Sequence, residues 1–335
     1  MQSWIVSGVV ASLIWGTYIV LLKVATSKLR ASVAFCAMTS GILVTSITTF
    51  LWKGNGVTFP MPETNWALLA GLAWGIGMGF VTHAVSLPPT AVSRLTPLYN
   101  VNTLVAVILG VFLLKEIPEL TKIAPVLAGA ILVVVGGYLV TKEPNAQNES
   151  NATMRHIEMN KILGIQKWVI CGVIAILMWG VYIVLLKQAV SPQYYGMEPS
   201  SAFLMMTLGI LVTSLITFLV ERRSKGNFSK SGFLTISLWP FIKPREIRLS
   251  SFQAGFIALI SGILWGIAML FVIHALSDLQ AFVAKLTPLY NTNTLVAVLL
   301  GFGFLAEGRN LKLKQILFIL FGAVCVMLGG WLVSM

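Results

Sequence analysis

The sequence has 335 residues, of which 57% are hydrophobic and only 10% are charged, and its formal net charge is +12. A soluble domain carries roughly 25% charged residues, so this composition excludes a soluble globular protein and indicates a surface that faces lipid. The Lys and Arg residues lie mostly between apolar runs, so they predict membrane topology and not nucleic-acid binding.

A helix that spans a membrane needs roughly 20 consecutive apolar residues. The first such run is too long for the core of a signal peptide and lacks a small-residue cleavage pattern, so we expect it to be retained. We therefore expect an all-α integral membrane protein with ten transmembrane helices. The apolar runs cover residues 4–25, 31–52, 65–86, 90–114, 121–141, 168–190, 200–220, 251–276, 279–305 and 312–334.

The two halves of the sequence repeat each other. We divide the chain into a first five-helix repeat at 1–141, a polar linker at 142–167 and a second five-helix repeat at 168–335, which contains a long basic loop at 221–250. An odd number of helices per repeat brings the second repeat into the membrane from the opposite side, so we expect the repeats to be inverted. The matching segments are 14–23 with 178–187, 41–46 with 209–214, 73–86 with 264–277, and 95–110 with 286–301.

The distribution of Lys and Arg predicts the orientation of the chain. Most of the basic loop residues follow odd-numbered runs, whereas Lys53, Lys115 and Lys122 lie on the opposite side. The positive-inside rule then places the first set in the cytoplasm and both termini outside it. We expect a multi-pass protein of the cell (inner) membrane.

Four basic residues lie within the spanning runs or at their ends, and they form two repeat-related pairs. Lys23 corresponds to Lys187, and Arg94 corresponds to Lys285. Because charges at membrane depth are costly, all four are candidates for binding an anionic or polyhydroxyl substrate. The alternative is that each side chain extends to the membrane interface.

His83 and His274 form a further repeat-related pair. Histidine can change its charge near neutral pH, so both residues are candidates for proton-linked transport. The alternative is that they are polar core residues with satisfied hydrogen bonds.

The fourth and ninth runs carry the densest polar signal. Threonine and tyrosine side chains fall on one helical stripe, which asparagines flank, and Pro97 and Pro288 are expected to kink or break these helices. Amides inside lipid must find a partner, either another helix or a substrate hydroxyl. The candidate substrate-binding residues here are Tyr99, Asn100, Asn102, Tyr290, Asn291 and Asn293.

Trp15 and Trp179 each precede a glycine in corresponding runs, as do Trp74 and Trp265. A tryptophan beside a small residue can form the wall of a solute pocket, and we take Trp74 and Trp265 as candidate binding residues. The alternative is that each packs as a bulky residue against a small one.

The sequence contains no P-loop, no H-E-x-x-H motif and no Cys/His cluster, and its three cysteines are far apart. We therefore expect no metal, no cofactor and no enzymatic activity. The expected partners are a small-molecule substrate and membrane lipids but no nucleic acid, and a homodimer stays open.

Three features recur in both repeats. They are Trp-Gly with a lysine later in the first helix, Trp-Gly in the third helix, and a helix that runs from a proline to a glutamate. The residues are Trp15, Gly16 and Lys23 with Trp179, Gly180 and Lys187; Trp74 to Gly77 with Trp265 and Gly266; and Pro97 to Glu116 with Pro288 to Glu307. In these features the chain resembles the drug/metabolite transporter superfamily. The likeness is to ten-helix EamA-like carriers, in particular the glucose/ribose porter and rhamnose transporter branch.

The resemblance implies an inverted-repeat bundle whose central cavity is lined by the first, third, fourth, sixth, eighth and ninth helices. It also implies alternating access, with sugars as the usual substrates of this branch. The sequence departs from these relatives in two respects. Familiar relatives have both termini in the cytoplasm, whereas the charge distribution here predicts the reverse. Small multidrug relatives carry an intramembrane glutamate, and no spanning run of this sequence contains one deep inside it. The second departure argues against a proton-coupled drug antiport.

The leading expectation is a secondary transporter or facilitator for a small polar metabolite, with a sugar favoured by the resemblance. The four cations favour an anionic metabolite, phosphorylated or carboxylated, as the alternative. A lipid flippase or scramblase and a non-transporting membrane scaffold are two further alternatives.

Overall fold

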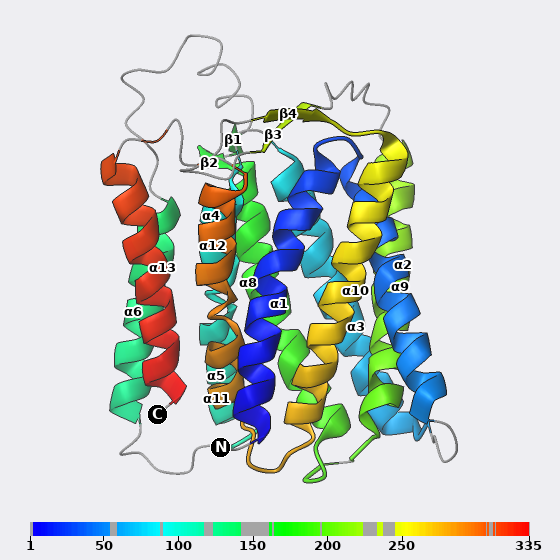
Figure 1. The fold of residues 1–335 in the computed structure, drawn as a ribbon. Coiled ribbons are helices and arrows are strands. Elements are labelled where there is room, and N and C mark those ends of the chain that lie inside the picture. Colours follow the sequence, from blue (N-terminus) through cyan, green and yellow to red (C-terminus); the bar gives the residue numbers. More distant parts are fainter. Residues whose placement is uncertain are drawn as a thin grey trace.

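The fold comes from a computed structural model, which describes residues 3–53, 59–87, 90–116, 123–141, 161–162, 164–194, 196–223, 233–236, 245–305, 307, 311 and 313–334. Within these residues the chain is almost entirely helical (Figure 1). Most of the expected polar linker, residues 142–160, and parts of the expected basic loop, 224–232 and 237–244, lie outside the described residues.

The helices of the first repeat follow the apolar runs, because inside lipid a helix satisfies every backbone N–H and C=O within the segment itself. They are α1 (Ser3–Thr26), α2 (Ala31–Lys53), α3 (Met61–Ser86), α4 (Val92–Tyr99), α5 (Asn102–Phe112) and α6 (Ile123–Thr141). The helices of the second repeat are α8 (Lys167–Val190), α9 (Pro199–Arg223), α10 (Ser251–Leu276), α11 (Val283–Tyr290), α12 (Asn293–Gly303) and α13 (Leu313–Ser334).

Among the described residues, eight helical stretches are long and apolar enough to cross a membrane. The expectation of a helical, multi-pass membrane protein is therefore confirmed. The departures from it are two short antiparallel hairpins in the polar loops. One pairs β1 (Lys161–Ile162) with β2 (Ile165–Gln166), and the other pairs β3 (Phe233–Ile236) with β4 (Arg245–Arg248).

The fourth and ninth expected helices each divide into two. α4 ends at Tyr99 and α5 begins at Asn102, while α11 ends at Tyr290 and α12 begins at Asn293. Pro97 lies inside α4, and its counterpart lies inside α11. A proline cannot donate a backbone hydrogen bond, and asparagine favours turns over helix interiors, so the helix weakens here. The break places backbone and side-chain polar groups in the middle of the bundle.

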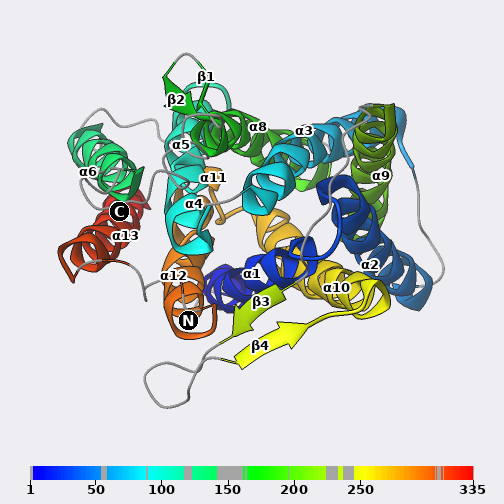
Figure 2. The ribbon, with the colours of Figure 1, turned by 90° about the horizontal axis from the view of Figure 1, so that it is seen from above.

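The principal helix packing joins one repeat to the other, as in the pairs α1–α10, α3–α8, α2–α10, α3–α9 and α6–α13. Glycines allow the closest approaches, since a Cβ on Gly71 would lie 1.9 Å from the Met206 carbonyl oxygen. A Cβ on Gly262 would lie 1.9 Å from the carbonyl oxygen of Met38. The pair α6–α13 lies beside the other helices (Figure 2).

α1 and α8 begin at opposite ends of the bundle (Figure 1). We call the end that carries β1–β4 the hairpin end. The end of α1, the beginning of α4 and the end of α12 lie at the hairpin end. The end of α8, the beginning of α11 and the end of α5 lie at the opposite end. The breaks between α4 and α5 and between α11 and α12 lie between these two ends.

Candidate functional site

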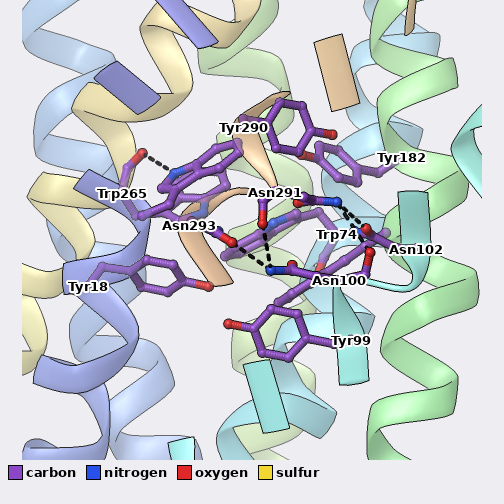
Figure 3. Close-up of a pocket in the computed structure, with 12 residues that line it drawn as sticks. Tyr18, Trp74, Tyr99, Asn100, Asn102, Tyr182, Trp265, Tyr290, Asn291 and Asn293 are labelled. Carbon is purple, nitrogen blue, oxygen red and sulfur yellow. Dashed lines mark hydrogen bonds between the residues drawn. The ribbon is translucent and has the colours of Figure 1, made fainter. Parts of the chain in front are cut away.

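A small pocket lies between the repeats, beside the two helix breaks (Figure 3). Six repeat-related pairs line it, and both members of each pair are the same residue type. The twelve lining residues are Trp15 and Trp179, Tyr18 and Tyr182, Trp74 and Trp265, Tyr99 and Tyr290, Asn100 and Asn291, and Asn102 and Asn293.

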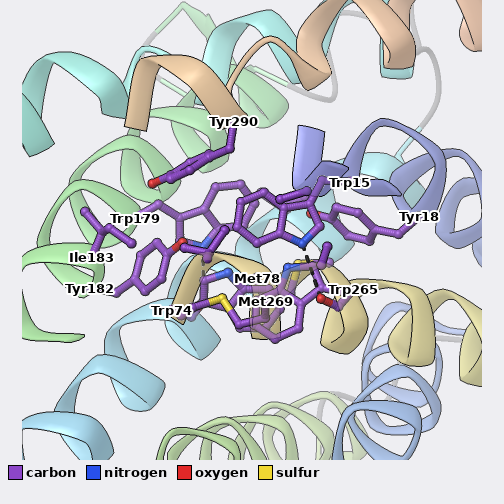
Figure 4. Close-up of a cluster of buried hydrophobic side chains, with 14 of the residues drawn as sticks. Trp15, Tyr18, Trp74, Met78, Trp179, Tyr182, Ile183, Trp265, Met269 and Tyr290 are labelled. Atoms are coloured by element: carbon purple, nitrogen blue, oxygen red, sulfur yellow. Dashed lines mark hydrogen bonds between the residues drawn. The ribbon is translucent and has the colours of Figure 1, made fainter. Parts of the chain in front are cut away.

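Four tryptophan rings form one row across the pocket (Figure 4). Trp74 and Trp265 lie at its centre, with ring centroids 4.1 Å apart and planes tilted by 44°. Trp15 stacks on Trp265 at 6.1 Å, and Trp179 stacks on Trp74 at 6.0 Å. The row therefore gives the pocket a continuous aromatic wall drawn from four helices.

Each outer tryptophan is fixed by a hydrogen bond across the repeat boundary. Trp15 Nε1 donates to the carbonyl of Trp265 at 3.3 Å, and Trp179 Nε1 donates to the carbonyl of Trp74 at 3.1 Å. A buried indole N–H needs such a partner, so these bonds hold the outer rings in one orientation.

Tyrosines close the ends of the tryptophan row. Tyr290 meets Trp15 edge-on at 5.0 Å, and Tyr99 meets Trp179 edge-on at 4.7 Å. The Tyr99 hydroxyl also lies 3.2 Å from Thr96 Oγ1, and Figure 3 shows the hydroxyls of Tyr18 and Tyr99 pointing toward one another. Phenol oxygens can both donate and accept, so they suit hydroxyl groups on a substrate.

The asparagines at the helix breaks bind each other across the repeats (Figure 3). Asn100 Nδ2 donates to Asn293 Oδ1 at 2.5 Å, and Asn291 Nδ2 donates to Asn102 Oδ1 at 2.6 Å. The same two amides also donate to hydroxyls, that of Thr294 at 2.6 Å and that of Thr103 at 2.7 Å. The four amides thus form a closed polar cluster that holds the two breaks together.

The paired lysines lie outside the twelve lining residues. Lys187 Nζ donates to three backbone carbonyls at the end of α10 and in the following loop, those of Leu276 at 3.0 Å, Asp278 at 3.2 Å and Ala281 at 2.8 Å. Lys23 Nζ donates to the carbonyls of Val85 at 2.6 Å and Thr90 at 2.8 Å, near the end of α3. Both ammonium groups therefore satisfy backbone acceptors at helix ends.

Arg94 and Lys285 also lie outside the lining residues. The Arg94 guanidinium lies 5.3 Å from the ring centroid of Trp168, and Lys285 Nζ lies 5.9 Å from that of Phe282. His83 and His274 are exposed positions of α3 and α10 and do not line the pocket. Substrate or proton binding by these four residues stays a prediction.

The pocket includes four residues that the sequence-based site does not contain, Trp15, Trp179, Tyr18 and Tyr182. The signal for them was present, because Trp-Gly-x-Tyr occurs in the first helix of each repeat. In a helix the tyrosine, three residues after the tryptophan, shares its face. No group of three or more possible metal ligands occurs among the described residues.

Comparison with known proteins agrees with this architecture. The sequence model of a family described as sugar transport protein matches residues 6–335, which is nearly the whole chain. A solved structure entitled "Crystal structure of protein" has 16% identity, a TM-score of 0.56, and coverage of 99% of this chain and 96% of that chain. A search of curated proteins finds no match. The match to the family model over nearly the whole chain, together with its apolar helices, shows that the chain belongs to the sugar transport protein family and is a membrane sugar transporter.

Proposed function

We propose that the protein is a secondary carrier or facilitator that moves an uncharged monosaccharide by alternating access through the tryptophan-lined pocket. The observation that carries this proposal is the lining itself, which consists only of tryptophan, tyrosine and asparagine. Aromatic faces pack against the C–H faces of a sugar ring, while amides and phenols exchange hydrogen bonds with its hydroxyls.

The proposed architecture is ten transmembrane helices in two inverted repeats, 1–141 and 168–335, joined by the polar linker 142–167. The ten are the eight apolar stretches together with α6 and the broken pair α11–α12. The opposite directions of α1 and α8 support the inversion, as does the pairing of identical residues around the pocket. This arrangement matches the proposed membership of the drug/metabolite transporter superfamily and its ten-helix EamA-like carriers.

The charges around the pocket favour a neutral substrate over an anion. The Lys23 and Lys187 ammonium groups already bind two and three backbone carbonyls, respectively. Moving either group toward a substrate would leave these acceptors without their donor in a buried site, which is costly. The pocket therefore offers no positive charge to compensate for a phosphate or carboxylate.

The test is counterflow with the purified full-length chain in liposomes. Vesicles loaded with a neutral hexose or pentose receive a trace of the same labelled sugar outside, and competitors are added in turn. We expect labelled neutral sugar to accumulate, and we expect neutral sugars but not sugar phosphates or sugar acids to compete. Trp74→Ala removes the centre of the aromatic wall and should abolish accumulation, whereas Val44→Ala changes an exposed residue of α2 and should not.

Two outcomes would contradict the proposal. Accumulation of only the phosphorylated or carboxylated sugars would support the anionic alternative. Movement of a fluorescent lipid across liposomes that contain the protein, without any sugar exchange, would support a flippase or scramblase.

A further inference from the structure

A carboxylate from the first repeat binds the beginning of a pocket helix in the second repeat. Glu116 follows α5, and its two carboxylate oxygens accept the backbone N–H groups of Val283 at 2.8 Å and Ala284 at 3.1 Å. These are the first two residues of α11. The N-terminal N–H groups of a helix have no partner within the helix, and the helix dipole favours negative charge there.

The second repeat makes the equivalent contact with the first. Glu307 follows α12 and accepts the backbone N–H groups of Val92 at 2.7 Å and Ser93 at 2.9 Å, the first two residues of α4. Each contact joins residues more than 160 positions apart in the chain, since the sequence separations are 167 and 215. Two equivalent carboxylates therefore connect the repeats reciprocally.

Glycines make room for both carboxylates. A Cβ on Gly110 would lie 2.8 Å from Glu116 Oε2, and a Cβ on Gly301 would lie 2.6 Å from Glu307 Oε2. The glutamate N–H in each case donates to the carbonyl of that glycine at 3.2 Å. Lys115, just before Glu116, has a φ of 54°, which is unusual for a residue other than glycine. The backbone is thus shaped to place the carboxylate over the glycine.

The two capped helices carry pocket residues at their other ends. α4 ends with Tyr99 and is followed by Asn100, while α11 ends with Tyr290 and is followed by Asn291. Each helix has only 8 residues, so its position at one end determines the position of the pocket side chains at the other. The glutamates lie outside the lining residues and act on them through these short helices.

The two carboxylate contacts lie at opposite ends of the bundle. α4 begins and α12 ends at the hairpin end, whereas α11 begins and α5 ends at the opposite end (Figure 1). If the repeats move apart at one end to expose the pocket, the contact at that end must break while the other can persist. Alternating access therefore requires these contacts to break in turn.

We propose that Glu116 and Glu307 are positioning residues that act as latches, each closing the pocket toward its own end of the bundle by holding a pocket helix of the other repeat. This inference rests on the proposed alternating access and names the two residues whose contacts break in turn. It assigns Glu307 to the hairpin end and Glu116 to the opposite end.

The test measures from which side of the membrane the interior is accessible. Leu22 and Leu186 are fully buried repeat-related residues of α1 and α8, one helical turn beyond Tyr18 and Tyr182. Each is replaced singly by cysteine in a full-length chain in which Cys36, Cys171 and Cys325 are replaced by serine or alanine. A membrane-impermeant maleimide is then added to one side of the liposomes at a time.

Glu307→Ala should raise labelling of Leu22→Cys from the hairpin end, and Glu116→Ala should raise labelling of Leu186→Cys from the opposite end. We expect an increase of about tenfold, because removing a charged hydrogen-bond acceptor shifts a two-state equilibrium by about that factor. Each variant should leave the other reporter unchanged or less reactive.

Glu221→Ala is the matched control. Its carboxylate also caps a helix of the other repeat, since Glu221 Oε2 accepts the Ser32 N–H of α2 at 2.8 Å. α2 contributes no lining residue, so this variant should not change the side from which either reporter is labelled. The latch is refuted if Glu307→Ala and Glu221→Ala change labelling to the same extent. It is also refuted if neither Glu116→Ala nor Glu307→Ala changes labelling.

Gly110→Ala and Gly301→Ala provide a second test if a glutamate variant does not fold. Their added methyl groups displace the carboxylates without removing them, and they should reproduce the same end-specific labelling. Counterflow of the unsubstituted protein separates the two proposals. Absence of sugar exchange contradicts the carrier function, whereas intact exchange with unchanged labelling in all four variants contradicts only the latches.

Discussion

The side-chain amide of Asn100 in the first repeat donates to the side-chain oxygen of Asn293 in the second, at 2.5 Å. Its repeat-related counterpart, Asn291, makes the same contact with Asn102. These reciprocal bonds place four amides at the two helix breaks, beside the aromatic wall. The polar cluster therefore serves both the contact between repeats and the pocket, so its loss should affect transport.

Asn100→Ala and Asn291→Ala should each lower the rate of sugar counterflow by about tenfold or more, because each removes a donor and leaves buried acceptors unpaired. The double variant should be little worse than either single variant, since both belong to one network. Counterflow rates of the two single variants and the double variant check this. Losses that multiply would show that the two amides act independently.

Much of the pocket was predictable from the sequence. Tyr99, Asn102 and their counterparts stand out because amides and phenols in an apolar run need partners, and the repeat doubles that signal. The helix break was predictable from Pro97, because proline removes a backbone hydrogen bond from the helix interior. Trp74 was predictable from its position before a small residue.

The role of the paired lysines was not predictable from the sequence. A lysine near a helix end gives the same pattern whether Nζ faces a substrate, the lipid headgroups or another helix. Lys187 reaches the carbonyls of Leu276 and Ala281, about 90 residues away in sequence, and only the packing of α8 against α10 brings them together. The cross-repeat contact of Glu116 with α11 was hidden for the same reason.

Lys187→Gln should destabilise the protein without changing its choice of substrate. The side chain is 2% exposed and donates to three carbonyls, so its loss should cost about 1–3 kcal/mol. A lower midpoint of thermal unfolding in detergent, with unchanged competition by sugars and by sugar phosphates, is expected. Loss of competition by a sugar phosphate in this variant would instead support the anionic alternative.

The aromatic wall should discriminate between sugars by ring stacking. Trp265→Phe keeps an aromatic face, whereas Trp265→Leu keeps only apolar volume. We expect the Phe variant to retain counterflow with a higher half-saturation concentration, and the Leu variant to lose counterflow. Equal activity of the two variants would show that this position supplies apolar packing alone.

The identity of all six lining pairs predicts similar affinity from both faces of the membrane. In inverted repeats, opening to one side exposes the same set of side chains as opening to the other. Half-saturation for a neutral monosaccharide should therefore agree within about threefold between the two faces, measured in liposomes of known protein orientation. A ratio of tenfold or more would exclude a symmetric site.

Single substitutions should break this symmetry in opposite senses. Tyr99→Phe and Tyr290→Phe remove the same hydroxyl from related positions. If one variant raises the half-saturation concentration more on one face of the membrane, the other variant should raise it more on the opposite face. Equal effects of both variants on the same face would argue against the inverted arrangement.

The proposed Glu116 latch should respond to pH. Burial raises the pKa of this carboxyl, and the hydrogen bonds from Val283 and Ala284 and the charge of Lys187 oppose that effect. Tyr194 also interacts with this carboxyl. In the open arrangement, a hydrated Glu116 would have the ordinary pKa of a glutamate. The closed arrangement then binds the proton more tightly, so low pH favours closure, and this advantage is lost as the pH rises through the raised pKa.

Labelling of Leu186→Cys from the end opposite the hairpins should therefore increase as the pH rises through that range. Thiol reactivity also increases with pH, so the comparison is with the same reporter in the Glu116→Ala chain, in which only the thiol effect remains. The ratio of the two labelling rates should change with pH for this reporter. A ratio that stays constant would show that release of the latch does not depend on the ionisation of Glu116.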